Sequence, residues 1–321
     1  MNTSEPSAPL NGNLPRIGVI GVGFMGALHA KHYAANPCAN LVSVVDINES
    51  RAKSIANLHG CSFYTEPEQL IGQVDAVSIA VPSNKHRQVA ELIISNGIHV
   101  LLEKPLASTV AEAEKIVQQA NEFGVKLLVG HQERFNSAIK ELADRIDMPQ
   151  YVEAHRQGQF EGRGGDVDVI TDLMIHDIDL VLTLIKSPIE SISALGARTV
   201  TPHIDIANAR IEFQNGAVAN VTASRVANER VRNFKVYANK QYLELDLLKQ
   251  SMTLTTTSAN RNNGDGTTTI QEPIDIIPNL TLRTEIDHFV DIIQNGATPY
   301  VTGEDGLSAV RVAQMIRETV G

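Results

Sequence analysis

The stretch RIGVIGVGFMGALHAKHYAA, residues 16–35, decides the fold of this chain. A β-branched run stops at a glycine, and the pattern after the third glycine is that of a helix. Between strand and helix, Gly21, Gly23 and Gly26 keep the spacing G-x-G-x-x-G, which is typical of a dinucleotide-binding loop. In such a loop Gly21 makes the tight turn, Gly23 lets the backbone approach a pyrophosphate, and Gly26 allows close packing of the helix on the strand.

The same loop predicts which dinucleotide is bound. Phe24 and Met25 lie inside it, where the helix N-terminus offers its first amides to phosphates. Asp46 ends the next β-rich run, 20 residues beyond Gly26, where a carboxylate accepts hydrogen bonds from the adenosine ribose and repels a 2′-phosphate. We therefore predict NAD rather than NADP. Two interpretations of the nearby Arg51 stay open: it softens this preference, or it is a solvated helix residue, which we favour.

Composition and charge limit the class of protein. The chain has 321 residues, of which 43% are hydrophobic and 20% are charged, enough for a core and for two domains. A net charge of −10 argues against nucleic acid or an anionic membrane as a partner. No apolar stretch approaches the ~18 residues of a membrane span, and the start MNTSEPSAPLNGNLP lacks a signal peptide. With two cysteines and no C-x-x-C motif, we expect a cytoplasmic protein.

The pattern of the chain changes near residue 150. Before it, short apolar runs such as DAVSIAV and HVLLE alternate with helical patterns, as in a doubly wound parallel sheet. After it, β-rich segments succeed one another, which favours a large open, mostly antiparallel sheet. We predict an α/β protein with a flexible tail at 1–14, a Rossmann domain at 15–132, and a second α/β domain for substrate binding and oligomerisation at 133–321.

Polar residues come after the strands of the first half, where doubly wound sheets place their ligands. Glu103, Lys104 and Pro105 end one strand, and Pro82 and His86 come after the strand before it. A lysine that leaves a buried strand needs a partner or a function, so Lys104 either lines the cleft or turns into water. A lone histidine such as His86 is more often a packing or capping residue than a catalyst. We include Pro82, His86 and Glu103 among the predicted cofactor-binding residues.

The segment DVDVITDLMIHDIDLVLTLI, residues 166–185, has a helical pattern with several acids and one histidine. Asp172 and His176 are four residues apart, which places them on one helix face, and Asp168 and Asp179 extend that stripe. An Asp–His pair serves as a metal site or as an oriented general base. No further His or Cys stands at ligand spacing, so we predict a base and no metal. A solvated pair of surface charges is the alternative.

Five motifs occur in one order: RIGVIGVGFMG, AVPSNKH, HVLLEKPLA, GHQERFN and DLMIHDIDL. In them the chain resembles the Gfo/Idh/MocA oxidoreductases (glucose–fructose oxidoreductase, inositol dehydrogenase and relatives) from residue 15 onward. The resemblance implies a Rossmann domain followed by an α/β domain on an open sheet, packed as homodimers or homotetramers. It also implies an NAD-dependent dehydrogenase that transfers a hydride from a sugar-like alcohol.

The resemblance also implies the reacting residues. Lys104 matches the lysine of the E-K-P motif, and Asp172 and His176 match the D-x-x-x-H pair, which the family brings to Lys104 in the cleft between the domains. We expect His176 to be the base, Lys104 to stabilise the developing alkoxide, and Asp172 to hold the substrate or the His–Lys pair in register. Lys104 as the terminal proton acceptor stays open. A cis Lys104–Pro105 bond is implied as well.

A narrower resemblance, in GRGGDVDVITDLMIHDIDL, DIANARIEFQNGAVANVTASR and VTGEDGLSAV, is to the branch that contains UDP-N-acetylglucosamine 3-dehydrogenases. It implies oxidation of that nucleotide sugar at C3, before transamination toward 2,3-diamino sugars. Arg156 and Arg163 are our candidates for contacting the substrate, and Arg225 is a further available cation. One alternative is a dehydrogenase of inositol or a free sugar. The other is a dinucleotide-sensing regulator, disfavoured because Lys104, Asp172 and His176 are all present.

Overall fold

The computed structural model describes residues 14–321, except residues 161, 163–166 and 260–266. Of the predicted tail, residues 1–13 lie outside the described part. The chain divides into two compact units. Unit 1 runs to Gln132 and adds Leu282–Val310, and unit 2 holds Glu133–Thr281 and Arg311–Gly321. Among the described residues, no helix combines the length and apolar character needed to cross a bilayer.

Unit 1 is built on a six-stranded sheet in the order β3-β2-β1-β4-β5-β6, and every strand pair in it is parallel. This confirms the predicted doubly wound sheet. Its strands are short and nearly all apolar, as expected for strands covered on both faces, and side chains such as Ile17, Val77 and Leu101 are fully buried. The strands are β1 (Arg16–Ile20), β2 (Asn40–Val45), β3 (Ser62–Tyr64), β4 (Ala76–Ile79), β5 (His99–Glu103) and β6 (Leu127–Gly130).

The helices of unit 1 connect these strands. The strand order reverses between β1 and β4, so right-handed connections place α1 and α2 on one face of the sheet and α3 and α4 on the other. Local caps fix their ends: Asn48 and Thr109 cap α2 and α4, which finish at left-handed Gly60 and Gly124. The helices are α1 (Phe24–Ala34), α2 (Glu49–His59), α3 (His86–Ile94) and α4 (Val110–Phe123), with short 3₁₀ turns at Pro67–Leu70, Ser83–Lys85 and Gln132–Phe135.

A later part of the chain completes unit 1. Helix α7 (Thr281–Asn295) and residues up to Val310 of α8 (Gly303–Val320) belong to this unit, although the sequence analysis grouped them with the second domain. The backbone explains the difference, because Val129 of β6 donates to the carbonyl of Val301 at 3.1 Å. Lys126 also donates to the carbonyl of Gly296, and a Cβ at Gly306 would lie 2.9 Å from Val129.

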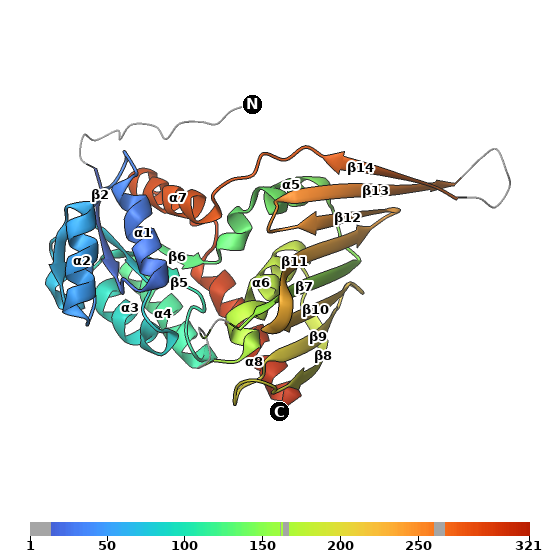
Figure 1. Ribbon diagram of the computed structural model, residues 1–321, viewed down its shortest axis with the longest axis horizontal. Coiled ribbons are helices and arrows are strands. Elements are labelled where there is room, and N and C mark those ends of the chain that lie inside the picture. The colour runs from blue at the N-terminus through green and yellow to red at the C-terminus, as the bar shows by residue number, and fades with distance from the viewer. Residues whose placement is uncertain (1–13, 161, 163–166, 260–266) are drawn as a thin grey trace. The chain divides into compact units, whose positions relative to one another are not determined.

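Unit 2 carries an eight-stranded sheet in the order β14-β13-β12-β11-β7-β10-β9-β8 (Figure 1). Only β7 and β10 pair in parallel, and the other pairs are antiparallel, which confirms the predicted open, mostly antiparallel sheet. The strands are β7 (Tyr151–Gln159), β8 (Ile189–Ala197), β9 (Ile206–Phe213), β10 (Val218–Ser224), β11 (Val226–Ala238), β12 (Gln241–Asp246), β13 (Ser251–Ala259) and β14 (Thr267–Ile274).

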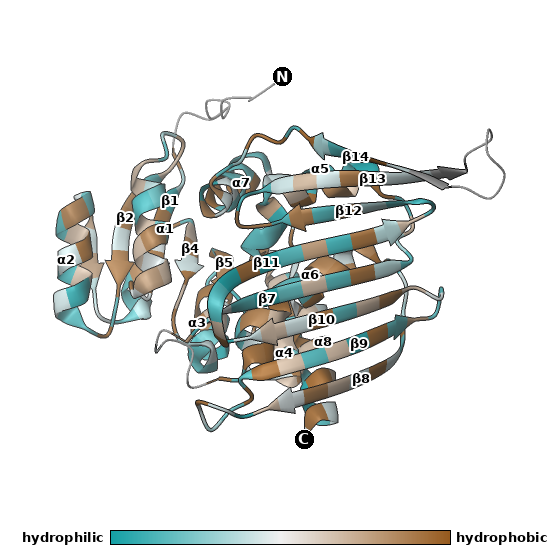
Figure 2. Cartoon of the chain, turned by 45° about the vertical axis from the view of Figure 1, so that its right-hand side comes forward, coloured by the Kyte–Doolittle hydropathy of each residue, from teal (hydrophilic) through white to brown (hydrophobic). Residues whose placement is uncertain are grey.

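One face of this sheet holds the helix that bears Asp172 and His176. Along β7, β9 and β10 every second side chain is buried, and the alternation is visible as changing hydropathy along the strands (Figure 2). The π-helical segment Ile170–Met174 contacts β10, and α6 (Ile175–Leu184) contacts β7 and β10, while α5 (Ser137–Arg145) contacts β12. The single helix expected over this stretch is therefore two segments, with a wider turn around Asp172.

Candidate functional site

The glycine loop of unit 1 has the geometry that a dinucleotide needs. Gly21 has φ +82°, and a Cβ there would lie 2.8 Å from the carbonyl oxygen of Ala80. A Cβ at Gly26 would collide with the carbonyl of Gly21, so helix α1 can pack here only without a side chain. At Gly23, by contrast, the nearest atom to a Cβ is Arg51 Nη1, 4.0 Å away. The loop therefore keeps open space at Gly23, where a pyrophosphate would approach the backbone.

Helix α1 begins directly after this loop. Its N-cap residue is Gly23, so no capping side chain competes for the first amides of the helix. Phe24 and Met25 occupy the first turn, and Phe24 is 61% exposed. An N-terminus with no side-chain cap and no acidic residue in its first turn suits a phosphate group. These features fit the predicted cofactor loop.

Asp46 lies at the end of β2, beside the loop. Its Oδ2 accepts a hydrogen bond from the Val22 amide at 2.9 Å, and its Oδ1 accepts one from Asn48 at 2.9 Å. Arg51 Nη1 is 3.4 Å from Oδ2, with the arginine side chain half exposed. Arg51 is therefore a solvent-exposed residue of α2, as we favoured, and its guanidinium also lies near Asp46 and Gly23.

Glu103 and Lys104 leave the end of β5. The Glu103 carboxylate is directed inward, where Oε1 contacts His29 Nε2 at 3.0 Å and Oε2 accepts from the Lys104 amide at 3.2 Å. Burial opposes ionisation of Glu103, but His29 and Lys104 together hold its pKa below the usual value. Lys104 itself is half-buried, and the Lys104–Pro105 bond is cis, as predicted. Glu103 therefore supports Lys104 from the protein interior.

His86 is the first residue of α3 and is 1% exposed. Its Nδ1 lies 2.8 Å from the carbonyl oxygen of Pro105 and its Nε2 lies 2.9 Å from that of Val81, and burial lowers its pKa. Both ring nitrogens are used inside the protein, so we reassign His86 from cofactor binding to fixing the turn after Lys104. Pro82 directly precedes the 3₁₀ turn that leads into α3.

In unit 2, Asp172 and His176 lie on consecutive helical segments. Asp172 is in the π-helical segment and is half-buried, whereas His176 is near the start of α6 and is 8% exposed. Asp168 precedes them and accepts from the Thr171 amide at 2.8 Å. No group of three or more His, Cys, Asp or Glu in the described part of the chain is arranged to hold a metal ion.

Arg156 does not have the role predicted for it. Its Nε and Nη2 donate to the Asp177 carboxylate at 2.9 and 2.8 Å, and its Nη1 donates to Glu133 at 3.0 Å. The residue is 2% exposed. A buried guanidinium with a carboxylate at each nitrogen serves the core rather than a pyrophosphate, so we withdraw Arg156 as a substrate contact. The other candidate, Arg163, lies outside the described residues.

An ionic cluster that was not predicted surrounds Glu133. This residue lies just after β6, is 4% exposed, and accepts from both Arg156 and Arg232. Burial opposes its ionisation, yet these two arginines lower its pKa. Burial and the neighbouring Arg156 lower the pKa of Arg232 to about 10. The sequence does hold a signal for this cluster, namely the acids inside the nearly all-apolar stretch IHDIDLVLTL. A carboxylate in such a stretch is buried and therefore requires a charged partner.

Asp179 illustrates the same signal. It was placed in the polar stripe of Asp172 and His176, but its carboxylate forms a bidentate pair with Arg134, at 2.8 Å from Nε and 2.6 Å from Nη2. Both side chains are almost fully buried. Asp177 and Asp179 therefore hold α6 to the rest of unit 2, and Asp172 and His176 are left as its candidate reactive groups.

A parallel sheet with an intact glycine loop, joined to a second unit on an open sheet, defines the class of dinucleotide-dependent oxidoreductases. Residues 15–131 match the family profile described as "Oxidoreductase family, NAD-binding Rossmann fold", and residues 145–244 match the "GFO/IDH/MocA C-terminal domain". The chain belongs to the Gfo/Idh/MocA family of NAD-binding oxidoreductases.

Individual relatives are dehydrogenases. The chain is 35% identical over 311 residues to UDP-N-acetylglucosamine 3-dehydrogenase of Acidithiobacillus ferrooxidans. The aligned region covers 95% of this chain and 97% of the relative. The solved structure of that enzyme superposes with a TM-score of 0.90 over 96% of this chain and 98% of the other, at 34% identity. The scyllo-inositol 2-dehydrogenase (NAD(+)) of Bacillus subtilis is more distant, at 28% identity over 90% of this chain and 89% of the relative.

Proposed function

We propose that this protein oxidises UDP-N-acetylglucosamine at C3 of the sugar, with NAD as the oxidant, to give the 3-keto nucleotide sugar. The observation that carries the proposal is near full-length similarity to an enzyme of that name, by sequence and by fold, well above the similarity to the inositol dehydrogenase. Lys104, Asp172 and His176 are present as the motifs require.

Unit 1 would hold the cofactor. The open space at Gly23, the first turn of α1 and the Asp46 carboxylate offer backbone approach, amides and an acceptor for ribose hydroxyls. When bound, NAD supplies the hydride acceptor, C4 of its nicotinamide. Glu103 and His86 do not contact the cofactor in this proposal. They fix the backbone at Lys104 and Pro105 by hydrogen bonds.

The protein's own residues would handle the proton of the alcohol. His176 takes that proton as general base, the role that histidine fills most often in enzymatic proton transfer. The Lys104 ammonium donates a hydrogen bond to the same oxygen and stabilises the negative charge that develops there. Asp172 holds the substrate or the His–Lys pair in register. The chemistry balances: the alcohol loses one proton to the protein and one hydride to the cofactor.

A homodimer or homotetramer is part of this proposal. The face of the second sheet opposite α6 carries the less buried side chains of each strand. On this face, Tyr237 stacks on Tyr242 with ring centroids 5.1 Å apart. Tyr237 also packs edge-on with Tyr151, with ring centroids 5.7 Å apart. An aromatic group of this kind supports self-association through unit 2.

The substrate is tested by supplying UDP-N-acetylglucosamine and NAD together with an aminotransferase and glutamate. Alcohol oxidation by NAD is uphill, so trapping the keto sugar as the 3-amino nucleotide sugar draws the reaction forward. We expect that product by mass spectrometry, formed only when all components are present. Robust NADH formation from inositol or a free sugar, without the amino sugar, would instead assign the protein to the inositol or free-sugar dehydrogenases. No turnover of any alcohol would favour a dinucleotide-sensing regulator.

A further inference from the structure

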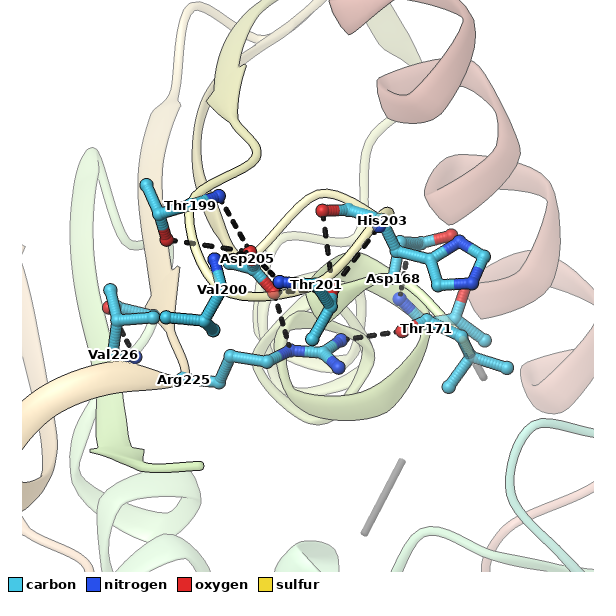
Figure 3. Close-up of polar contacts among 11 residues, drawn as sticks. Asp168, Thr171, Thr199, Val200, Thr201, His203, Asp205, Arg225 and Val226 are labelled. Carbon is cyan, nitrogen blue, oxygen red and sulfur yellow. Dashed lines mark hydrogen bonds and ion pairs between the residues drawn. The ribbon is translucent and has the colours of Figure 1, made fainter. Parts of the chain in front are cut away.

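The loop before β9 is closed by a buried carboxylate. Asp205 is fully buried, and its Oδ2 accepts from three consecutive amides, those of Thr199, Val200 and Thr201, at 2.7, 2.8 and 3.0 Å. Its Oδ1 accepts from the Thr201 hydroxyl at 2.7 Å. Figure 3 shows Asp205 at the centre of these donors. Burial opposes ionisation, but the donors hold the pKa of Asp205 far below its usual range, so the residue stays a carboxylate.

Arg225 connects this loop to a second segment. It stands between β10 and β11, is 3% exposed, and donates its amide to the Asp205 carbonyl at 3.0 Å. Its Nε lies 3.7 Å from Asp205 Oδ1, while its Nη2 donates to the carbonyl of Val167 at 2.7 Å. The side chain extends from Asp205 toward the segment that bears Asp168 and Thr171 (Figure 3). Arg225 therefore bridges the Asp205 loop and Val167. These contacts give its guanidinium a structural role inside unit 2 rather than a role in binding substrate.

The segment from Val167 to Thr171 is held at further points. The Val169 amide donates to the Ile204 carbonyl at 2.8 Å, from the loop that Asp205 closes. Arg317, on α8, lies 3.6 Å from the Asp168 carboxylate and 3.4 Å from the Thr171 hydroxyl. Several contacts thus fix the backbone immediately before Asp172.

The held segment leads directly into an unusual helical turn. Residues Ile170–Met174 form a π-helix, a rare conformation that occurs mostly as single turns and is frequent at functional sites. It contains Asp172, and His176 lies in the first turn of α6. The contacts at Val167–Thr171 therefore bear on the placement of both candidate reactive groups.

We propose that Arg225, fixed in place by Asp205, is a positioning residue for Asp172 and His176. It acts by holding the Val167 carbonyl and with it the start of the π-helical turn. This inference rests on the proposed function, since positioning matters to catalysis only if Asp172 and His176 take part in the reaction.

The role depends on the shape of the arginine. One guanidinium nitrogen of Arg225 faces the Asp205 carboxylate, while a second nitrogen donates to the Val167 carbonyl. A lysine side chain has a single nitrogen and lacks this fork, so it does not reproduce both contacts. Arg225→Lys therefore keeps the charge and loses the bridge, and Arg225→Met keeps the length and loses both. Arg210→Lys is the matched control, because Arg210 is a half-exposed arginine of the neighbouring strand β9 that pairs only with Glu212 among the described contacts.

The full chain is assayed with NAD and UDP-N-acetylglucosamine. We expect kcat to fall roughly tenfold to a hundredfold in both Arg225 variants, as small misplacements of reacting groups cause. The dissociation constant for NAD, from calorimetry, should stay within about twofold, because the glycine loop belongs to unit 1 and Arg225 to unit 2. Amides of residues 169–176 should exchange hydrogen faster in both variants, and Arg210→Lys should match the unmodified protein throughout.

A double variant separates positioning from general damage. If Arg225 acts through the Asp172/His176 pair, Arg225→Lys should lower kcat much less in the His176→Ala background than in the unmodified protein. An equal loss in both backgrounds, or unchanged exchange and kcat in Arg225→Lys, would overturn the proposal. Full activity of His176→Ala would instead reject the proposed function, and the exchange data would still report whether Arg225 holds the turn. Should Arg225→Met fail to fold, the charge-preserving lysine variant carries the same comparison.

Discussion

At the scale of single residues, Asp46 organises the backbone of the loop that we propose as the cofactor site. Its two oxygens accept from Val22 and Asn48, so the carboxylate ties the glycine loop to the start of α2. Asn48 in turn caps that helix by accepting from the Arg51 amide at 3.0 Å. The cap places Arg51 in the first turn, where its guanidinium reaches the carboxylate. Spacing alone identified Asp46, but the position of Arg51 depends on where α2 begins.

Asp46→Ser should weaken NAD binding and relax the discrimination against NADP. The serine loses the charge that repels a 2′-phosphate, and Arg51 loses its carboxylate partner and becomes available to that phosphate. We expect NAD affinity to fall roughly tenfold, the scale of one charge-assisted hydrogen bond, with calorimetry of both dinucleotides as the measurement. Glu49→Gln, on the same helix, is the control. Equal or better turnover of NADP by the unmodified protein would contradict the predicted role of Asp46.

At the scale of elements, α7 brings a carboxyl group into the core of unit 1. Glu285 is fully buried on this otherwise amphipathic helix, and neither side-chain oxygen has a hydrogen-bond partner among the described residues. Burial, and then the charge of Glu103 on β5, raise the pKa of Glu285 well above its usual value. Tyr33, on α1, also interacts with Glu285. Two buried carboxyl groups that repel each other are best accommodated with Glu103 ionised and Glu285 protonated.

Glu285→Gln should therefore stabilise the protein increasingly as the pH rises. Above about pH 4.3, the ordinary glutamate pKa, the unfolded chain releases a proton that the folded chain retains. Stability of the unmodified protein then falls by at most about 1.4 kcal/mol per pH unit until the folded pKa is reached. Glutamine mimics the protonated acid and does not titrate, so the two proteins should be similar near pH 4.5 and diverge toward pH 8.

Urea denaturation across this range measures the effect. Asp291→Asn is the matched control, because Asp291 is an exposed acid on the same helix. A pH-independent difference for Glu285→Gln would show that Glu285 is ionised in the folded protein.

For the whole molecule, the sequence predicts the architecture better than it predicts which distant residues contact one another. Short apolar runs and G-x-G-x-x-G determine the parallel sheet, because both signals are local. The placement of Leu282–Val310 with unit 1 depends on backbone pairing between Val129 and Val301, residues far apart in the chain, which no local pattern contains. Arg156 failed as a substrate contact for the same reason, since its carboxylate partners lie on other elements.

Lys104 belongs to unit 1 and His176 to unit 2, so the proposed mechanism requires both units. If both act on one alcohol, Lys104→Ala and His176→Ala should each lower kcat by roughly 10²-fold or more. NAD affinity should be nearly unchanged. The double variant should be about as slow as the slower single variant, because groups that serve one proton transfer are not additive.

Single-turnover and steady-state kinetics with UDP-N-acetylglucosamine provide the rates. Lys53→Ala in unit 1 and Lys186→Ala in unit 2 remove exposed charges and serve as controls, with activity expected near that of the unmodified protein. Losses that multiply in the double variant would mean that Lys104 and His176 serve separate steps. Full activity in either single variant would mean that the reacting groups lie elsewhere, and Asp172→Asn, which keeps the shape of the side chain and removes its charge, would then be the next variant to measure.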